Sequence, residues 1–318
     1  MKNTELIIIG SGYMSREYIK VLNHMHIKPI VVGRGQKKIS ELKKIFPEII
    51  CFDGGLESFF KNHKSFPKVA INTSSINSLN ETNLLLIKND VKKILVEKPG
   101  DLEISNLNNL RKVEKQSDFK LVIGYNRRFY ENIQFFKNKI LNKEKILSAH
   151  FEFTEWVHKI SPKDYSKESL SKWITSNSSH VIDTVFYLIG FPNKIFSQVH
   201  QKNSIKWHES GSIFTGCGQT VKNIPFTYNS NWISAGRWSI EISTNKYRYY
   251  FRPMEKIFRQ KIGSIDLQEI LIDKKLDSKF KPGLYLQTKN FLNSKFDSFV
   301  TINEQINMLD LYNKIGNY

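Results

Sequence analysis

The first 125 residues alternate short apolar segments with amphipathic ones. The apolar segments are rich in Ile, Val and Leu, which predicts buried strands, and the segments between them have helical spacing. A repeated strand–helix–strand order predicts a parallel sheet with helices on both faces and a ligand at the carboxyl ends of the strands. The expected strands are residues 5–9, 29–32, 48–52, 69–72, 93–96 and 120–123, and the expected helices are residues 16–25, 38–46, 77–88 and 104–116.

After about residue 145 the pattern changes to longer alternating strands, which predicts a mostly antiparallel sheet. The expected strands are residues 146–156, 194–199, 212–217, 225–231, 237–243 and 246–251. One strong helix is expected at residues 179–189, where Gly190 and Pro192 end it, and helices at 284–293 and 303–313 are expected to pack back on the body. The predicted fold class is α/β followed by α+β, with domains at residues 1–125 and 126–318.

Composition excludes several classes of protein. The formal net charge is +18, but the basic residues are scattered and form no basic stripe, so we expect no nucleic-acid partner. Two cysteines cannot form a disulfide framework or a multi-thiolate metal site, which favours a cytoplasmic location and no metal. The apolar run at residues 6–9 is far shorter than the ~20 residues of a bilayer span, so no membrane association is expected.

A glycine-containing turn follows the first expected strand and opens a helix. It reads Gly10-Ser11-Gly12-Tyr13-Met14 and is followed by the small residue Ser15. Two glycines permit a tight turn in which a pyrophosphate approaches backbone N–H groups at the positive end of a helix. The turn therefore predicts a dinucleotide site formed by residues 10–14, in a Rossmann domain; the alternative is a plain strand-to-helix turn.

The second expected strand ends without an acidic residue. An Asp or Glu at this place normally accepts a hydrogen bond from the 2′-hydroxyl of NAD(H), but residues 32–38 contain none. The Arg34 guanidinium can instead pair with a 2′-phosphate. We therefore prefer NADP(H) to NAD(H) as the cofactor; alternatively, Arg34 and the neighbouring lysines form a solvated turn.

Three further motifs complete a resemblance to a known family. They are Glu97-Lys98-Pro99 after the fifth expected strand, Gly124-Tyr125-Asn126-Arg127-Arg128-Phe129 after the sixth, and His180-Val181-Ile182-Asp183 on the helix of the second domain. With the glycine turn, they resemble the signature of the glucose-fructose oxidoreductase, inositol dehydrogenase and MocA family (Gfo/Idh/MocA). The resemblance covers essentially the whole chain.

The resemblance implies an enzyme that transfers a hydride between a nicotinamide and a sugar or sugar derivative, with nucleotide-linked keto-sugars among the candidates. It also implies a C-terminal open-faced sheet that binds substrate and forms a homo-oligomer. Lys98 would contact the reacting oxygen and His180 would act in proton transfer. An ammonium beside a nicotinamide can polarise a carbonyl and donate a proton, and a histidine titrating near ~6.5 suits a relay. The alternative to a catalytic role is that Lys98 is an ordinary surface lysine and that His180 is a histidine packed within its helix.

The resemblance also extends to further contacts. The expected cofactor contacts are Thr73, Ser74, Glu97 and Lys98, and the expected substrate contacts are Tyr125, Asn126, Arg127, Ser176, Asn177 and His180. Glu97 and Arg127 could instead pair with each other, and we expect Asp183 to orient or pack. Four arginines would suit an anionic substrate, namely Arg127, Arg128, Arg248 and Arg252.

One departure from the family's pattern leaves the function open. Ser176 and Ser178 stand where the family commonly carries Asp and Gly before the histidine. The carboxylate expected there is missing, although Ser and Asn are also favoured at a helix N-terminus. Two alternatives therefore remain: a non-catalytic dinucleotide-binding regulatory protein, and a cofactor-retaining enzyme of the glycosidase type.

Overall fold

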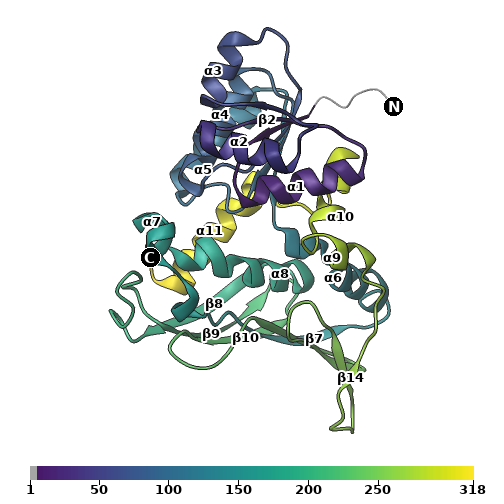
Figure 1. The fold of residues 1–318 in the computed structure, drawn as a ribbon. Helices are drawn as coiled ribbons and strands as arrows, with labels where there is room; N and C mark the ends of the chain where they lie inside the picture. The colour runs from purple at the N-terminus through teal and green to yellow at the C-terminus, as the bar shows by residue number, and fades with distance from the viewer. Residues whose placement is uncertain (1–5) are drawn as a thin grey trace. The chain divides into compact units, whose positions relative to one another are not determined.

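The computed structural model describes residues 6–318 and divides into two compact units (Figure 1). The first contains the chain up to residue 126 together with residues 276–307, and the second contains residues 127–275 and 308–318. Residues 276–307 thus group with the first unit, although the sequence analysis places them in a second domain that begins at residue 126. The division into functional domains at residues 1–125 and 126–318 therefore remains a prediction. The expected start of the first strand, Glu5, lies outside the described residues.

A six-stranded parallel sheet forms the centre of the first unit. Its strands are β1 (Leu6–Ile9), β2 (Ile30–Val32), β3 (Ile50–Phe52), β4 (Val69–Asn72), β5 (Lys93–Glu97) and β6 (Lys120–Gly124). Their order is β3-β2-β1-β4-β5-β6, and all five neighbouring pairs are parallel. The predicted α/β class is therefore confirmed. The chain order reverses between β1 and β4, the position where doubly wound sheets bind ligands.

Helices cover both faces of this sheet. As a result, every residue of its central strand β1 is buried. The helices are α1 (Tyr13–His24), α2 (Gln36–Ile45), α3 (Gly55–Asn62), α4 (Leu79–Lys88), α5 (Ile104–Gln116) and α10 (Leu284–Leu292), with a 3-10 turn at Ile76–Ser78. Side chains of β1, α3, α4 and α5 share one apolar cluster that includes Ile7, Phe59, Leu86 and Leu110.

Two differences from the expected helices have local causes. Helix α1 begins at Tyr13, three residues before the expected start. The early start was missed because Tyr13 is exposed and so does not belong to the buried apolar face of the helix. Helix α3 was not expected, since the two glycines before Leu56 are typical of a turn and the helix has only eight residues.

An eight-stranded sheet forms the second unit. Its strands are β7 (Ile146–Glu152), β8 (Pro192–His200), β9 (Ile213–Thr220), β10 (Pro225–Asn231), β11 (Ser239–Thr244), β12 (Tyr247–Phe251), β13 (Phe258–Lys261) and β14 (Gln268–Glu269). They lie in the order β14-β13-β12-β11-β7-β10-β9-β8. All pairs are antiparallel except β7 with β10, where Phe226 lies opposite Ala149. The mostly antiparallel sheet is confirmed, and the polar strands β13 and β14 were not predicted.

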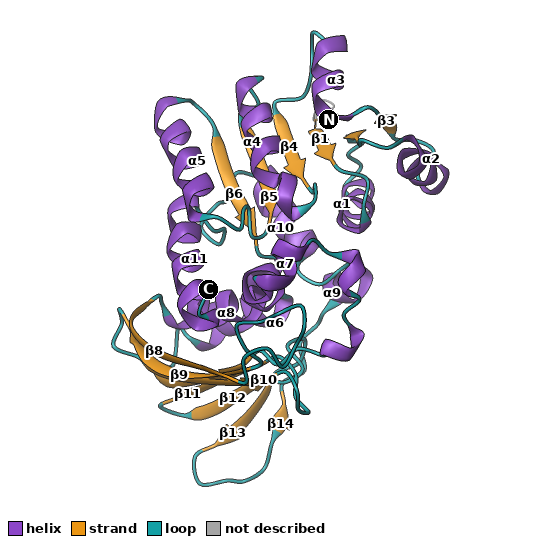
Figure 2. Cartoon of the chain, turned by 90° about the vertical axis from the view of Figure 1, so that its left-hand side faces the viewer, coloured by secondary structure: helices purple, strands orange, loops and turns teal. Residues whose placement is uncertain are grey.

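Three helices of the second unit lie on one face of this sheet (Figure 2). They are α6 (Glu131–Phe135), α7 (Lys167–Ser171) and α8 (Ser179–Ile189), with π-helical turns at Phe136–Ile140 and Ile174–Ser178 and 3-10 turns at Asn126–Phe129, Val157–Lys159 and Pro162–Asp164. The ring of Phe186 on α8 lies 5.7 Å from that of Phe151 and 5.1 Å from that of Phe226. Along β10, exposed and buried residues alternate, so its other face is open.

The remaining helices are α9 (Lys275–Lys279) and α11 (Ile302–Gly316). Helix α11 contributes its first residues to the first unit and those from Met308 onward to the second. Within residues 6–318, no helix is both long enough and apolar enough to cross a bilayer.

A buried histidine lies in the aromatic core of the second unit. The Nδ1 of His208 donates to the Gly211 carbonyl oxygen at 2.8 Å, and its Nε2 accepts from the Tyr318 hydroxyl at 2.7 Å. The ring of Trp232 lies 4.7 Å away. Burial lowers the pKa of His208 from 6.5 to about 4, so this histidine is neutral in the folded protein at pH 5.

Acidification should therefore destabilise the second unit. Because the pKa of His208 is lower in the folded than in the unfolded protein, the neutral histidine costs no stability above about pH 6.5. The free energy of unfolding then falls as the pH drops toward 4. Between pH 7 and pH 5 we expect His208 to cost about 2 kcal/mol of unfolding free energy, measured by urea titration with tryptophan fluorescence. His208→Gln should lose this part of the pH dependence, whereas the control His150→Gln, at a partly buried histidine on β7, should keep it. Equal pH dependence in wild type and His208→Gln would contradict the assignment.

Candidate dinucleotide-binding and substrate-binding sites

The turn after β1 requires glycine at its first position. Gly10 has φ +113°, and a Cβ there would lie 2.8 Å from both the carbonyl oxygen and Oγ1 of Thr73. A Cβ on Gly12 would meet no atom within 4 Å, so the backbone there is open. Gly12 is the N-cap of α1, and no side chain caps this helix end. The first N–H groups of α1 are therefore available to an anion.

A cavity of about 1000 Å³ opens in front of this turn. It lies along the carboxyl edge of the sheet, at the reversal between β1 and β4. Its lining includes all five residues predicted to bind a dinucleotide, Gly10, Ser11, Gly12, Tyr13 and Met14, and also Gly33, Arg34, Gly35, Lys38, Glu57, Thr73, Ser74, Ser75, Glu81 and Lys88. The cavity is large enough for a dinucleotide, and glycine backbone forms part of its wall.

Arg34 lies on the wall of this cavity directly after β2. Its side chain is exposed, and it makes no ion pair with any described residue. Lys38 lines the same cavity, and so do two acids that the sequence analysis missed, Glu57 and Glu81. The wall therefore offers both a guanidinium for a phosphate and carboxylates for ribose hydroxyls.

Thr73 and Ser74 line the cavity at the end of β4, and their hydroxyls also bind the protein. Thr73 Oγ1 donates to the Ile9 carbonyl oxygen at 2.8 Å and lies 2.7 Å from Ser15 Oγ. Ser74 Oγ donates to Asn72 Oδ1 at 2.8 Å. The Thr73 bonds tie the end of β4 to the end of β1 and the start of α1, and the Ser74 bond stays within the turn after β4. Direct contact of either hydroxyl with a cofactor stays a prediction.

Glu97 ends β5 and belongs to a buried polar network. Its Oε1 accepts from the Tyr18 hydroxyl at 2.8 Å, and that hydroxyl accepts from Gln287 Nε2 at 2.7 Å. Burial raises the pKa of the Glu97 carboxyl, while the Tyr18 hydrogen bond and the charges of Lys98 and Lys281 act in the opposite direction. The network joins α1, β5 and α10. Its role in cofactor binding stays a prediction.

Lys98 follows Glu97 at the carboxyl edge of the sheet. It is partly buried, and the peptide bond to Pro99 is cis. The Gly100 N–H donates to the Glu97 carbonyl oxygen at 3.0 Å and closes a turn around Lys98. Neither Glu97 nor Lys98 lines the cavity described above. An ammonium at this edge, next to a carboxylate, is suited to holding or moving a proton.

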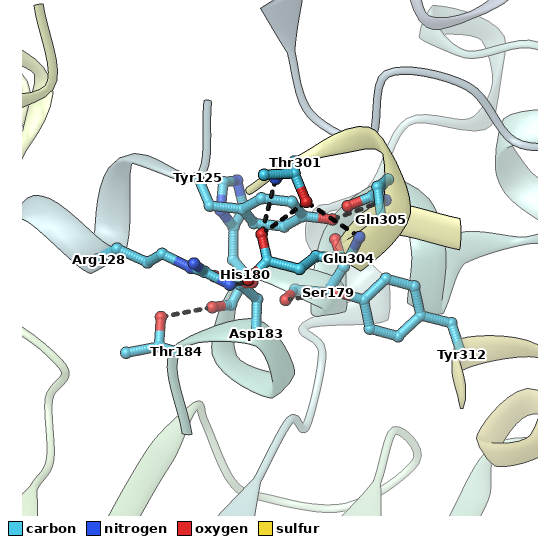
Figure 3. Close-up of polar contacts among 10 residues, drawn as sticks. All are labelled: Tyr125, Arg128, Ser179, His180, Asp183, Thr184, Thr301, Glu304, Gln305 and Tyr312. Atoms are coloured by element: carbon cyan, nitrogen blue, oxygen red, sulfur yellow. Dashed lines mark hydrogen bonds and ion pairs between the residues drawn. The ribbon is translucent and has the colours of Figure 1, made fainter. Parts of the chain in front are cut away.

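Tyr125 and Asn126 are buried, and both contact the returning C-terminal segment. The Tyr125 hydroxyl accepts from Gln305 Nε2 at 3.2 Å (Figure 3), and Asn126 Nδ2 donates to the Pro282 carbonyl oxygen at 2.9 Å. These bonds explain why residues 276–307 group with the first unit. Substrate contact by either side chain stays a prediction.

Arg128 and Asp183 form a buried ion pair in the second unit (Figure 3). Arg128 Nε and one terminal nitrogen donate to the two carboxylate oxygens at 2.8 and 2.7 Å. The guanidinium also lies 4.8 Å from the Tyr187 ring. Asp183 therefore neutralises Arg128, which agrees with the expected orienting or packing role of Asp183 and removes Arg128 from the cations suited to an anionic substrate.

His180 lies in the first turn of α8 and is 9% exposed. Its ring lies 6.1 Å from that of Trp238, which in turn lies 4.5 Å from the Arg127 guanidinium. The second unit thus brings together two of the expected substrate-binding residues, His180 and Arg127, around one tryptophan. Lys98 belongs to the first unit and His180 to the second.

Glu155 supplies a buried carboxylate that the sequence analysis missed. It is 3% exposed; Ser178 Oγ donates to its Oε1 at 2.6 Å, and Asn177 Nδ2 donates to both its oxygens at 3.0 and 3.1 Å. Burial raises the pKa of this carboxyl. Glu155 therefore anchors the π-helical turn that precedes His180. Ser176 is also buried in this turn, and substrate contact by Ser176 or Asn177 stays a prediction.

A sequence signal for Glu155 existed. The expected strand 146–156 alternates and gives Glu155 the parity of the buried Phe151 and Phe153, although β7 ends at Glu152 and Thr154 is buried as well. An acid at an inward position needs polar partners, which marks it as exceptional. Within residues 6–318, no group of three or more His, Cys, Asp or Glu side chains is arranged to hold a metal ion.

Comparison of the sequence with protein-family profiles and with curated proteins gives no match. Solved structures do share the fold. A dehydrogenase (MviM) from Clostridium difficile is 17% identical, with a TM-score of 0.78 over 99% of both chains. A levoglucosan dehydrogenase in complex with NADH and L-sorbose is 12% identical, with a TM-score of 0.79 over 99% of this chain and 96% of that one. UDP-N-acetylglucosamine 3-dehydrogenase GnnA from Acidithiobacillus ferrooxidans is 12% identical, with a TM-score of 0.75 over 99% and 97%.

Removing one member of the buried ion pair should destabilise the second unit. Asp183→Ala leaves Arg128 buried without its counter-charge, and we expect a loss of about 3 to 5 kcal/mol in unfolding free energy by urea titration. The matched control is Asp310→Ala, which removes an exposed partner of Lys314 and should have a much smaller effect. Equal losses in the two variants would contradict a stabilising role for the buried pair.

Proposed function

We propose that the chain is an oxidoreductase of the Gfo/Idh/MocA type that transfers a hydride between a nicotinamide dinucleotide and a sugar or sugar derivative. The observation that carries this proposal is the Gly10–Gly12 turn, which opens on a cavity at the reversal of the strand order. The fold is shared with dehydrogenases, two of which act on sugars by their names. A nucleotide-linked keto-sugar is one candidate substrate.

The residues around the cavity fit a dinucleotide. The N-terminus of α1 has no side-chain cap, so its N–H groups can bind a pyrophosphate. Gly12 has no side chain, which leaves space for the pyrophosphate to come close to the backbone. When bound, the nicotinamide supplies or accepts the hydride. Ser11, Tyr13 and Met14 contribute to the wall in the same turn.

The proposal assigns proton transfer to two residues, Lys98 in the first unit and His180 in the second. Lys98 donates a proton to the substrate oxygen as a carbonyl is reduced and accepts it when an alcohol is oxidised. The neighbouring Glu97 carboxyl is held in place by the Tyr18 hydroxyl, and burial raises its pKa. His180 suits proton transfer because histidine changes its charge near neutral pH.

NADP(H) is the preferred cofactor in this proposal. The unpaired Arg34 and the nearby Lys38 line the cavity and suit a 2′-phosphate. Glu57 in the same wall and the NADH of the levoglucosan dehydrogenase complex support NAD(H) as the alternative.

Further parts of the proposal concern association and location. The second sheet exposes Leu147 and Phe196, which supports a homo-oligomer formed through this sheet. A cytoplasmic location, and the absence of nucleic-acid, membrane and metal partners, remain predictions from the sequence.

Reversing the charge at Arg34 tests the cofactor assignment. Arg34→Asp should weaken NADPH binding by about tenfold to a hundredfold, because a charge-assisted pair with the 2′-phosphate is replaced by repulsion. NADH affinity should change little. The matched control Lys37→Asp alters an adjacent exposed charge that does not line the cavity, and isothermal titration calorimetry measures all four affinities. Equal weakening of NADPH and NADH by Arg34→Asp would contradict the NADP(H) preference.

Removing the Lys98 amine tests the chemistry. In a screen of sugars and nucleotide sugars followed at the nicotinamide absorbance band, Lys98→Met should lower kcat by about 10²- to 10⁴-fold, a much larger effect than any change in dinucleotide affinity from the lost cofactor contact. The exposed Lys92→Met is the control and should retain activity.

Two other outcomes would favour the alternatives. Dinucleotide binding without turnover of any sugar by the wild type would favour a regulatory protein, which the serine at position 176 also suits. Product formation without net oxidation or reduction of added nicotinamide would favour the cofactor-retaining glycosidase type.

A further inference from the structure

Two guanidinium groups lie against one tryptophan in the second unit. The Arg127 guanidinium is 4.5 Å and that of Arg237 is 4.8 Å from the centre of the Trp238 ring. Trp238 is buried at the start of the segment that leads into β11. Stacking of this kind fixes planar cations in place while their edges remain able to donate hydrogen bonds.

The charges of this cluster do not balance. Glu155 lies 3.7 Å from Arg237, and its oxygens already accept hydrogen bonds from Asn177 and Ser178. Arg127 makes no ion pair with any described residue, and its Nε is buried without a hydrogen-bond partner. A buried guanidinium nitrogen without an acceptor is unusual in a folded protein, because an unmade hydrogen bond to a charged group is costly.

The neighbouring arginine shows the contrast. Arg128 follows Arg127 in the sequence, but its guanidinium is neutralised by Asp183 at 2.7 and 2.8 Å. Only nine of the 48 basic residues are arginine, so arginine is not this chain's ordinary source of positive charge. A planar fork that binds both oxygens of a carboxylate or phosphate is what arginine offers and lysine does not.

An exposed aromatic ring lies beside the same cluster. Trp156 is 48% exposed, and the Arg237 guanidinium lies 4.7 Å from its ring. Its Nε1 donates to the Gly236 carbonyl oxygen at 2.9 Å, which fixes the ring. A fixed, exposed aromatic ring next to cationic donors can hold the apolar face of a ring while the charged edge is bound.

We propose that the substrate is a sugar derivative carrying an anionic group, a carboxylate or a phosphate, which Arg127 and Arg237 bind beside Trp238. Trp156 packs against the rest of the ligand. His180, whose ring lies 6.1 Å from Trp238, is then close to the bound sugar. The assignment rests on the proposed function, which it deepens by naming the class of substrate.

Calorimetric titrations of matched ligands test this assignment without relying on turnover. The probes are D-glucose, D-glucuronate, D-glucose 6-phosphate and UDP-glucose, added to the full-length protein with and without saturating NADPH. At least one anionic probe should bind at least tenfold more tightly than glucose, and its affinity should fall with added salt. Glucuronate and the two phosphate-containing probes distinguish a carboxylate from a phosphate as the recognised group.

Variants locate the site. Arg127→Gln and Arg237→Gln should each weaken the anionic probe by about tenfold to a hundredfold and leave glucose unchanged. Arg127→Lys should recover only part of the affinity, because the charge returns without the planar fork. The matched control is Arg259→Gln, which removes another guanidinium of the same unit that also lies against an aromatic ring, that of Tyr247 at 4.9 Å. Circular dichroism and urea unfolding check that each variant folds.

Three outcomes would overturn the inference: no anionic probe binding more tightly than glucose, no loss of affinity in folded Arg127→Gln and Arg237→Gln, or an equal loss in Arg259→Gln. Failure of the proposed function is a separate result, since it would appear as absence of both NADPH and NADH binding in the cofactor titrations.

Discussion

The close approach of the β1 turn to the end of β4 is the constraint on which the candidate dinucleotide site depends. Gly10 adopts a φ of +113°, and its Cα lies so near Thr73 that a side chain would overlap the Thr73 carbonyl oxygen. The Thr73 hydroxyl closes the same gap by donating to Ile9. With both turns held together, the open backbone at Gly12 faces the cavity at the reversal of strand order. A larger residue at position 10 would separate the strands that shape the site.

Residues 276–307, which are far from the first unit in the sequence, fold as part of it. Gln287 on α10 reaches the hydroxyl of Tyr18, which binds the carboxylate next to Lys98. Gln305 and the Pro282 carbonyl oxygen hold Tyr125 and Asn126 in the same unit. Residues that resemble substrate contacts in the sequence thus also have structural partners, and the edge that carries Lys98 is supported by a buried polar network.

In the second unit, the distribution of carboxylates decides what each arginine can do. Asp183 neutralises Arg128, and Glu155 anchors the turn before His180 while lying near Arg237. Arg127 is left with aromatic partners only among the described residues. Glu155 comes from a different segment and supplies a carboxylate to the turn that contains Ser176, since Asn177 and Ser178 both donate to it.

The sequence by itself determined the two sheets, the positions of the central strands and the glycine turn, because apolar periodicity and glycine placement are local properties of the chain. It also indicated all five residues of the first turn that line the cavity. Only the tertiary structure decided that Arg128 is neutralised while Arg127 is not, that Glu155 turns inward beside Asn177, and that residues 276–307 complete the first unit. These features depend on contacts between residues 22 to 269 positions apart, which no local pattern encodes.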